Sequence, residues 1–428
     1  MILILFRILN LGFIYNLATG KNIVMISVEE ALEKILSSIH VMGEEEVSLL
    51  DSLGRVIAED VYSHLTIPPW NNSAMDGYAI IAEDVKSASK ENPVRFRVLE
   101  DLPAGKVSER KIKRGESIRI MTGAPIPEGA DAVIMNEVTE KDGEFVKILS
   151  PVSVNENIRP AGEDIKIGDL LLKKGKLLVP SDIGIMASIQ KSRVTVFQRP
   201  RVAILSTGDE LVDIDEPITK GKIVNSNSYS LEAQVTEAGG IPISLGIAKD
   251  TRDDLSKKLN SGLGADVLIT SAGISVGDYD FVKDVFTDLG MTMKFWKVAM
   301  KPGKPVAFGD IKGKPVFGLP GNPTASMLCF ELFVRPSLLK MQGRSDLFRK
   351  GVTAESLEDI KKKPGRRHFI RTITSCKDGQ YYFKTTGAQG SGMLTSMVLA
   401  NSLAIIPEDL SILKKGEKTR IILLDERI

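Results

Sequence analysis

Glycine, lysine and aspartate gather in one stretch of the chain, in a pattern suited to binding phosphate and a metal ion. The stretch contains SAGISVGDYD (271–280), KPGKP (301–305) and GLPGNP (318–323), and each segment lies where a predicted strand ends. Glycine lets backbone N–H groups approach a ligand closely, lysine supplies fixed positive charge, and carboxylates such as Asp278 and Asp280 can hold a hard cation. The stretch therefore predicts a site for a phosphorylated ligand and a metal.

The elements around this stretch would bring such loops together. Between 201 and 343, predicted strands alternate with predicted helices, which indicates an α/β domain with a largely parallel sheet. In such a sheet a ligand lies outside the carboxyl ends of the strands. Five predicted strands carry Asp, Glu, Lys or a Gly/Pro turn at that end. The candidate residues there are Ser206, Thr207, Gly208, Asp209, Glu210, Asp250, Ser271, Gly273, Ser275, Gly277, Asp280, Lys301, Lys304, Pro320, Gly321, Asn322 and Pro323.

Each segment also has an interpretation that needs no ligand. In TGDEL (207–211) Asp209 could cap a helix, KPGKP could be a surface connector, and Asn322 followed by Pro323 suits a helix start. The segment 271–280 resists this interpretation, because a turn needs one or two glycines rather than ten residues with two acids. Because the segments occur together at strand ends, we favour a ligand site.

Composition narrows the function class. The 428 residues include 56 Lys+Arg and 55 Asp+Glu, a net charge of +1 that offers no footprint for nucleic acid or an anionic membrane. Cys329 and Cys376 lie far apart, and neither has a second Cys or a His beside it, which argues against a disulfide or zinc site. The chain also lacks the P-loop and dinucleotide-binding signatures. We therefore expect carboxylates and lysines to carry the chemistry, with no nucleic-acid or membrane partner.

The first 24 residues need separate treatment. They are apolar, but Arg7 and Asn10 interrupt them, and they are too short and broken to span a membrane. Directly after Met25, Ser27 and Glu30 form a capping box that starts a predicted helix. We expect Met25 to be the true first residue, residues 1–24 to be a misassigned start or a disordered extension, and the protein to be cytoplasmic.

The remaining chain is too long for one core, and its sequence pattern changes several times along its length, which predicts several domains. Short alternating strands broken by Gly and Pro form a β-rich module that interrupts a mixed N-terminal domain. Within the latter we expect a strand around 46–49, a second helical stretch before residue 65, and a helix over 181–189. A turn at Asp378-Gly379 predicts a hairpin near the end. The predicted domains are 25–65 with 168–198 (mixed N-terminal), 66–167 (inserted β-rich), 199–344 (α/β) and 345–428 (small C-terminal β).

Further motifs lie in the β-rich module: SAMDGYA (73–79), MTGAP (121–125) and AGED (161–164). An Asp-Gly turn such as Asp76-Gly77 is ordinary by itself. With GADAV, STGDEL, KPGKP, GLPGNP and GSGMLTSM (390–397), however, these motifs follow the order found in molybdopterin molybdenumtransferases. From Met25 onward the chain resembles this family, the MoeA and gephyrin E-domain family, over nearly its full length.

The resemblance implies an architecture and a reaction. The expected fold has a central α/β molybdopterin-binding domain of the MogA type, an inserted β-rich lid, a mixed N-terminal domain and a small C-terminal β-barrel. The expected subunit forms a homodimer in which the lid of one copy covers the cleft of the other. The expected reaction inserts molybdate, or tungstate, into adenylylated molybdopterin with Mg²⁺-dependent release of AMP. A transient complex with a MogA/MoaB-type adenylyltransferase would supply that substrate.

The resemblance also implies residue roles. Glu210, Asp250 and Asp280 would hold Mg²⁺. Lys297 and Lys301 would attract molybdate and stabilise developing charge, with Lys304 a weaker candidate. The residues expected to line the pterin and phosphate pocket are Ser271, Gly273, Ser275 and Gly277. Pro320 and Pro323 are expected to make the last loop rigid. The residues expected to act from the lid are Asp76, Thr122 and Asp164.

The chain departs from the family pattern at two positions. Ala272 stands where a second glycine is usual, and Asn71 stands where many members carry Asp. Two other functions stay open. A molybdopterin adenylyltransferase shares the α/β fold, but the lid motifs and the C-terminal domain argue against it. A non-catalytic scaffold of the gephyrin type is the other, and the retained Asp76, Asp280 and Lys301 argue against it.

Overall fold

The computed structural model describes residues 25–272 and 281–425, which fold into two compact units. Among these described residues, the first unit comprises 25–46, Gly54–Ala58, 195–272 and 281–425, and the second comprises Val47–Leu53 and Glu59–Val194. The chain crosses between them four times: within β1 (Glu44–Ser48), after Leu53, after Ala58 and within β12 (Arg193–Phe197). The division into four domains stays a prediction.

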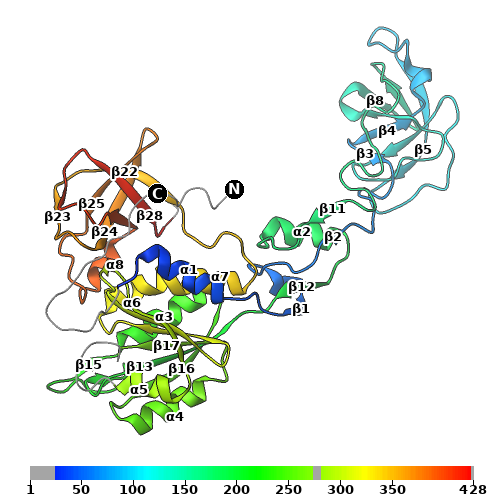
Figure 1. Ribbon diagram of the computed structural model, residues 1–428. Helices are drawn as coiled ribbons and strands as arrows, with labels where there is room; N and C mark the ends of the chain where they lie inside the picture. Colours follow the sequence, from blue (N-terminus) through cyan, green and yellow to red (C-terminus); the bar gives the residue numbers. More distant parts are fainter. Residues whose placement is uncertain (1–24, 273–280, 426–428) are drawn as a thin grey trace. The chain divides into compact units, whose positions relative to one another are not determined.

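A six-stranded sheet forms the centre of the first unit (Figure 1). Its order is β16-β13-β17-β21-β20-β18, and β20 runs antiparallel to both neighbours while the other five share one direction. The sheet is therefore largely parallel, as expected, but β20 was not predicted. The strands are β13 (Arg201–Thr207), β16 (Ile241–Ala248), β17 (Val267–Ser271), β18 (Thr292–Lys297), β20 (Pro305–Ile311) and β21 (Lys314–Leu319).

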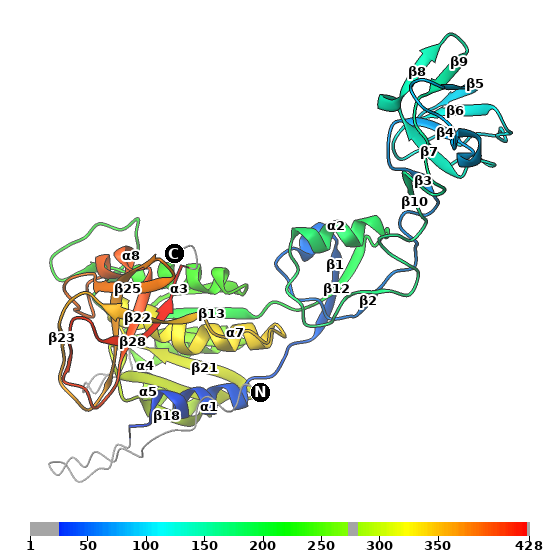
Figure 2. The ribbon, with the colours of Figure 1, turned by 90° about the horizontal axis from the view of Figure 1, so that it is seen from above.

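Helices cover both faces of this sheet, because alternate residues of each strand point to opposite faces. Val202 and Ile204 of β13 join the core beneath α1, α3, α6 and α7, whereas Ala203 and Leu205 join the core beneath α4 and α5. Figure 1 shows helices on both sides of the sheet, and Figure 2 shows the same elements from above, where the layers overlap. The helices are α1 (Val28–Ser38), α3 (Ser226–Glu237), α4 (Arg252–Gly262), α5 (Phe281–Asp288), α6 (Pro323–Cys329) and α7 (Arg335–Met341).

Two helix starts confirm the sequence analysis. Ser27 and Glu30 exchange the two hydrogen bonds of a capping box at the start of α1. Asn322 is the N-cap residue of α6 and Pro323 its first residue, although the Asn322 side chain makes no capping hydrogen bond. The apolar run after Pro323 is not one continuous helix, since a π-helical segment, Phe330–Val334, separates α6 from α7.

The C-terminal part of the first unit is a closed five-stranded barrel. It closes because β26 pairs with both β24 and β28. The predicted hairpin is confirmed, with Asp378 and Gly379 at positive φ between β24 and β25. The two-residue strand β19 (Met300–Lys301) pairs with β24 and joins the KPGKP segment to the barrel. The barrel strands are β22 (Gly351–Ser356), β24 (Arg367–Lys377), β25 (Gln380–Thr385), β26 (Ser402–Ile406) and β28 (Lys418–Leu423), and α8 (Thr395–Leu399) lies between β25 and β26.

The second unit contains the β-rich module, a six-stranded sheet of order β7-β4-β6-β5-β9-β8. The helix expected over 181–189 is confirmed as α2 (Pro180–Ser188). The second helical stretch expected before residue 65 is wrong: only a 3₁₀ turn, Leu50–Ser52, forms, and Gly54 at φ 73° follows it. The module's strands are β4 (Gly77–Ile80), β5 (Val94–Leu102), β6 (Glu116–Ile120), β7 (Ala132–Met135), β8 (Thr139–Asp142) and β9 (Phe145–Ile148), and the short pair beside it is β3 (Asn72–Ser73) and β10 (Ile158–Arg159).

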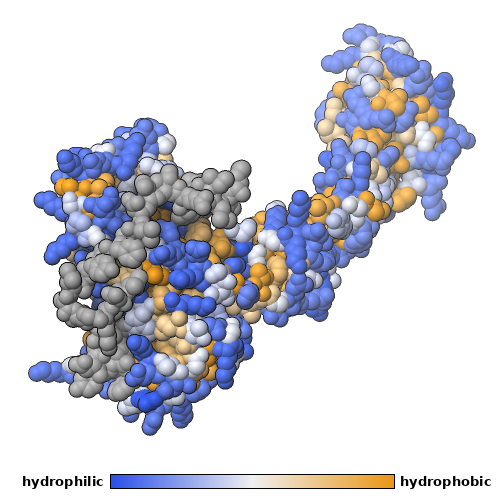
Figure 3. Space-filling view, in the orientation of Figure 1, coloured by the Kyte–Doolittle hydropathy of each residue, from blue (hydrophilic) through white to orange (hydrophobic). Residues whose placement is uncertain are grey.

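Hydrophilic residues make up much of the surface that Figure 3 shows, with apolar residues in smaller groups among them. Within residues 25–272 and 281–425, no helix has both the length and the apolar character needed to cross a membrane.

Candidate functional site

The carboxyl ends of the five strands that share a direction lie at one edge of the central sheet. Thr207 ends β13, Ala248 ends β16, Ser271 ends β17, Lys297 ends β18 and Leu319 ends β21. The predicted residues that follow these ends therefore gather at this edge, and it is where a ligand of such a sheet would lie. Gly273, Ser275, Gly277 and Asp280 lie outside the described residues.

Two predicted aspartates meet where β13 and β16 end. The backbone N–H of Asp209 donates to Asp250 Oδ2 at 3.3 Å, and the backbone N–H of Asp250 donates to Asp209 Oδ1 at 3.2 Å. Burial raises the pKa of Asp250, and the negative charges of Asp209 and Glu210 raise it further. The turn thus holds three acidic side chains within electrostatic reach of one another. Asp209 caps no helix, because Leu211 and Val212 form a strand, β14.

Gly208 allows the Glu210 carboxylate to fold back over the turn. It has φ 144°, and a Cβ placed on it would lie 2.5 Å from Glu210 Oε2, so a larger residue would displace that carboxylate. In the described part of the chain, no three His, Cys, Asp or Glu side chains are placed to hold a metal ion. Mg²⁺ commonly takes only one or two carboxylates, with waters and substrate phosphates as its other ligands. Asp250 and Glu210 fit that kind of site.

The first turn of α3 supports three of the strand ends, which the sequence analysis missed. Asn225 Oδ1 accepts a hydrogen bond from Ser206 Oγ at 3.0 Å and caps the helix at the Ser228 N–H. Asn227 Nδ2 donates to Ser271 Oγ and to the Gly321 carbonyl, both at 2.8 Å. The run NSNS at 225–228 is a recognisable helix-start signal. Only the fold shows that it reaches β13, β17 and the loop after β21.

The predicted serine and threonine of β13 are buried rather than open to solvent. Ser206 is 1% exposed and its hydroxyl also lies 2.9 Å from Ser228 Oγ, while Thr207 is 2% exposed. Ser206 therefore supports the turn from below. Thr207 Oγ1 has no hydrogen-bond partner within the described residues.

Ala272 has a conformation that favours glycine. Its φ is 77°, its N–H donates to the Leu319 carbonyl at 3.0 Å, and a Cβ built on Gly321 would lie 3.1 Å from its own Cβ. The left-handed region is unfavourable for alanine. At this departure from the family pattern, a methyl group therefore fills the space beside Gly321.

Three predicted lysines lie between the end of β18 and the start of β20. Lys297 pairs in register with Pro305, and burial lowers the pKa of its ammonium, with Lys304 and Lys283 lowering it further. Lys301 and Lys304 are exposed. Lys301 pairs with His368 across β19 and β24, which places it beside the barrel.

Lys301 lines a pocket of about 520 Å³ between its own loop and the barrel. Arg371 lines this pocket as well, and its side chain is fully buried. Its Nε donates to Ser396 Oγ at 3.1 Å and its Nη2 to the Gly390 carbonyl at 3.0 Å, but its Nη1 has no partner in the described structure. A buried guanidinium with a spare donor suits an anion.

Besides Arg371, four lysines and one histidine line this pocket, and the lysines add to its positive character. Burial lowers the pKa of His368 to about 4, and Lys362 and Lys301 lower it further, so this imidazole is neutral near pH 7. The lysines that line the pocket besides Lys301 are Lys361, Lys362 and Lys363. Arg371 was not predicted from the sequence; its position in the apolar strand segment HFIRTI was the available signal.

The late GSGMLTSM segment reaches the start of α6. The Thr324 N–H donates to the Ser391 carbonyl at 3.1 Å, and Thr324 Oγ1 donates to the Met393 carbonyl at 3.3 Å. The barrel thereby contacts the helix that follows Pro320, Gly321 and Asn322.

In the second unit, Asp76 and Thr122 form a pair. Asp76 Oδ1 accepts hydrogen bonds from the Thr122 N–H at 2.7 Å and from Thr122 Oγ1 at 2.8 Å. These two bonds lower the pKa of Asp76, and the positive charge of Arg119 lowers it further. The carboxylate is exposed. Gly77 must follow it, because a Cβ there would lie 1.9 Å from the Ile134 carbonyl oxygen.

Hydrogen bonds also link the three predicted motifs of this unit. The Gly123 N–H donates to the Ser73 carbonyl at 2.8 Å, and the Ala161 N–H donates to Asn71 Oδ1 at 2.8 Å. Asn71 thus supplies the acceptor for Ala161 without a negative charge. Asp164 is exposed beside Ile67, and no described contact joins it to Asp76 or Thr122.

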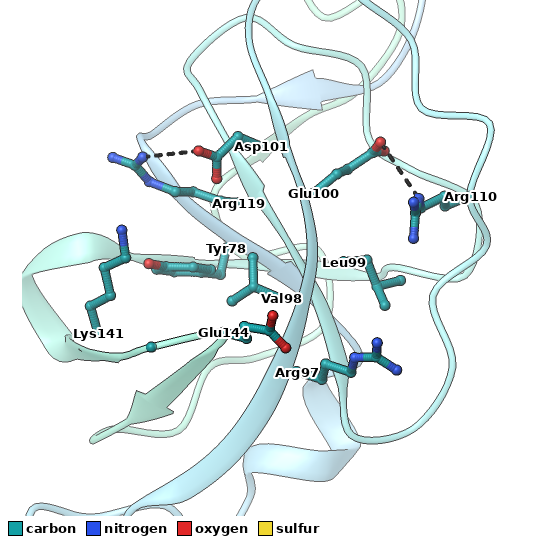
Figure 4. A pocket seen from close by; sticks show the side chains of 11 residues that line it. Tyr78, Arg97, Val98, Leu99, Glu100, Asp101, Arg110, Arg119, Lys141 and Glu144 are labelled. Atoms are coloured by element: carbon teal, nitrogen blue, oxygen red, sulfur yellow. Dashed lines mark hydrogen bonds and ion pairs between the residues drawn. The ribbon is translucent and has the colours of Figure 1, made fainter.

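A second pocket, of about 430 Å³, lies in the β-rich module and includes Arg119 and Tyr78 in its lining (Figure 4). Four of the charged residues that line it form two ion pairs: Arg119 with Asp101 at 3.5 Å, and Arg110 with Glu100 at 3.7 Å. It holds none of the predicted site residues, but Arg119 connects it electrostatically to Asp76.

Comparisons with known proteins agree along the chain. Residues 26–189 match the model of the MoeA N-terminal region (domain I and II), residues 203–340 that of a probable molybdopterin binding domain, and residues 353–424 that of the MoeA C-terminal region (domain IV). The molybdopterin molybdenumtransferase of Staphylococcus aureus (strain COL) is 35% identical over 404 residues, which cover 94% of this chain and 96% of the relative.

Two further relatives extend this similarity. The molybdopterin molybdenumtransferase of a Nostoc species is 37% identical over 386 residues, 89% of this chain and 88% of the relative. The crystal structure of a molybdopterin biosynthesis moea protein from Pyrococcus horikosii superposes with a TM-score of 0.80 at 34% identity, covering 94% of this chain and 100% of that one.

Proposed function

The chain belongs to the MoeA family of molybdopterin molybdenumtransferases, and we propose on this premise that it inserts molybdenum from molybdate into adenylylated molybdopterin with release of AMP. Its place is in molybdenum cofactor biosynthesis. One observation of the structure carries the proposal furthest: acidic side chains and an anion pocket occur in the same unit, at the sheet edge and beside Lys301.

The acidic turn is proposed to bind Mg²⁺, through Asp250 and Glu210 in the described structure and through Asp280 as the sequence predicts. When bound, Mg²⁺ neutralises phosphate charge and favours cleavage of the phosphoanhydride. Asp250 is suited to bind such a cation, because burial and two neighbouring acids make its own negative charge unfavourable. A bound cation would relieve that repulsion.

The pocket beside the barrel is proposed to receive the oxyanion. Arg371 lines this pocket, and the Nη1 of its buried side chain has no partner among the described residues, while exposed lysines at the pocket rim would attract a dianion from solution. Lys301 lies both at this pocket and at the end of the sheet, so it is suited to guide the oxyanion toward the bound pterin. Molybdate and tungstate carry the same charge, so charge alone would not separate them.

The Asp76–Thr122 pair is proposed to act from a second copy of the chain. Its hydrogen bonds keep Asp76 ionised in a rigid turn, which suits a carboxylate that orients a reacting group. We propose a homodimer in which the lid of each copy completes the site of the other. We further propose that the protein acts in the cytoplasm and that a MogA/MoaB-type adenylyltransferase supplies its substrate. Mixing inactive Asp76→Ala and Asp250→Ala proteins should then restore activity, because mixed dimers regain one intact site.

The test is AMP release from adenylylated molybdopterin. We expect release to require both Mg²⁺ and molybdate or tungstate, and to stop when either is omitted. Consumption of ATP without oxyanion-dependent release of AMP would indicate an adenylyltransferase instead. Binding of the substrate without any release of AMP would indicate a scaffold.

A further inference from the structure

Asn227 joins two strand ends that border the proposed substrate site. It lies in the first turn of α3, and its Nδ2 donates one hydrogen bond to Ser271 Oγ and one to the Gly321 carbonyl, both at 2.8 Å. Because a carbonyl oxygen only accepts, the atom facing Gly321 must be the nitrogen, which fixes the orientation of the amide. Both amide hydrogens are therefore committed to the two loops.

The acceptor of the same side chain is left without a partner. Asn227 is 9% exposed, and its Oδ1 is buried with no hydrogen-bond partner in the described structure. Leaving a buried acceptor without a hydrogen bond destabilises the fold by about as much as a neutral hydrogen bond stabilises it. The two donated bonds are thus largely offset, and stability alone does not account for asparagine at this position.

The loops that Asn227 joins are held closely in other ways as well. The Ala272 N–H donates to the Leu319 carbonyl, and a Cβ built on Gly321 would lie 3.1 Å from the Ala272 Cβ. With the link through Asn227, the end of β17 and the loop after β21 form one unit. The bond to Gly321 also turns that carbonyl toward α3, so its negative end does not repel an anionic ligand.

We propose that Asn227 is a positioning residue that sets the spacing between Ser271, at the end of β17, and Gly321, in the loop after β21, for the phosphate-bearing substrate. The inference rests on the proposed function, in which this edge of the sheet binds adenylylated molybdopterin. It assigns Asn227 no contact with the reacting atoms. Its loss should weaken substrate binding far more than it slows the bound substrate's reaction.

Gln234 provides a matched control on the same helix. It lies two turns further along α3, its Nε2 donates to the Met327 carbonyl at 3.2 Å, and its Oε1 is also buried without a partner in the described structure. Gln234 thus has the same chemistry but touches neither loop of the site. If amides on α3 only maintain the fold, Asn227→Ala and Gln234→Ala should behave alike.

The experiment measures the Kd for adenylylated molybdopterin, the kcat for AMP release at saturation, and the Tm of each variant. For Asn227→Ala we expect a Kd about tenfold weaker, the effect of roughly one lost hydrogen bond, with kcat within about threefold of wild type. Asn227→Asp should bind more weakly still, because an ionised carboxylate not only lacks the donor but also places a negative charge against the Gly321 carbonyl oxygen. Gln234→Ala should leave the Kd within about twofold while shifting the Tm similarly.

Three results would overturn the inference: an unchanged Kd in Asn227→Ala, an equal loss of affinity in Gln234→Ala, or a loss confined to kcat. If Asn227→Asp fails to fold, Asn227→Ser replaces it and should lie between wild type and Asn227→Ala. A wild-type chain that does not bind the substrate would contradict the proposed function instead, so the two failures are distinguishable.

Discussion

Asp209 and Asp250 exchange backbone-to-carboxylate hydrogen bonds across the ends of β13 and β16, so that each turn orients the acid of the other. The arrangement holds like charges close together, and the pKa of Asp250 is raised as a result of burial and of these charges. A fold under no functional demand gains nothing from such repulsion. The pair therefore marks the place where a cation would be most strongly favoured.

Asp250→Asn should make the protein more stable and less active. A raised pKa means that the folded state favours the neutral form, so the charged wild type is penalised above its folded pKa. The gain in Tm should therefore be fully present at neutral pH and vanish as the pH falls below the unfolded value near 3.8. Thermal unfolding from pH 3 to 8 measures this, and AMP release should fall at least about tenfold. A variant that is active but no more stable would contradict this account of Asp250.

Thr122→Val should raise the pKa of Asp76 while leaving its backbone hydrogen bond in place. Asp76 has a lowered pKa, so its stabilising effect is present above the unfolded value and is lost as the pH falls through the folded one. Without the hydroxyl donor, the acid limb of the activity profile should move to higher pH. Carbon-13 NMR titration of the carboxylate measures the shift, and Thr122→Ser should behave as wild type. Equal titration curves for valine and serine would rule out the hydroxyl as a cause.

Arg371→Met should raise the KM for molybdate while leaving the affinity for adenylylated molybdopterin unchanged. The buried guanidinium is proposed to bind the oxyanion through its Nη1, which has no partner in the part of the chain that the structure describes, and a lost charged hydrogen bond corresponds to about tenfold or more. Lys363→Met is the matched control, because it removes an exposed charge from the rim of the same pocket. Its smaller effect should disappear as the salt concentration rises. A KM for molybdate that is the same in Arg371→Met and wild type would remove the pocket from the proposal.

Ala272→Gly should stabilise the protein by about 1 kcal/mol, because alanine is disfavoured at positive φ. Urea unfolding compares the two proteins directly. The methyl group of Ala272 packs toward Gly321, so its loss works in the opposite direction. A less stable glycine variant would mean that this packing outweighs the backbone strain.

Much of the sheet edge could be predicted from the sequence, because parallel strands place their carboxyl ends together whatever their order. The acids after β13 and β16 and the lysines after β18 needed only correct strand assignments. β20 was missed although Lys312 and Gly313 form a tight turn with positive φ before β21. The KPGKP segment directly before β20 has a composition that is typical of a loop, so the strand that follows was not predicted.

Asn227 and Arg371 could not be assigned from the sequence, for a common physical reason. Each acts on residues distant in the chain: Asn227 on Gly321, and Arg371 on the pocket that Lys301 shares. Helix start signals and strand alternation place the two residues in their elements. Only the packing of α3 on the sheet and the closure of the barrel place them beside the site.

The central claim is the coupling of molybdenum insertion to AMP release. The direct measurement incubates the purified chain with adenylylated molybdopterin, Mg²⁺ and molybdate, and then determines both AMP and molybdenum bound to the pterin. The account predicts equal amounts of the two products from the wild-type protein and neither product from Asp250→Ala. Release of AMP without molybdenum incorporation, or undiminished formation of both products by Asp250→Ala, would contradict it.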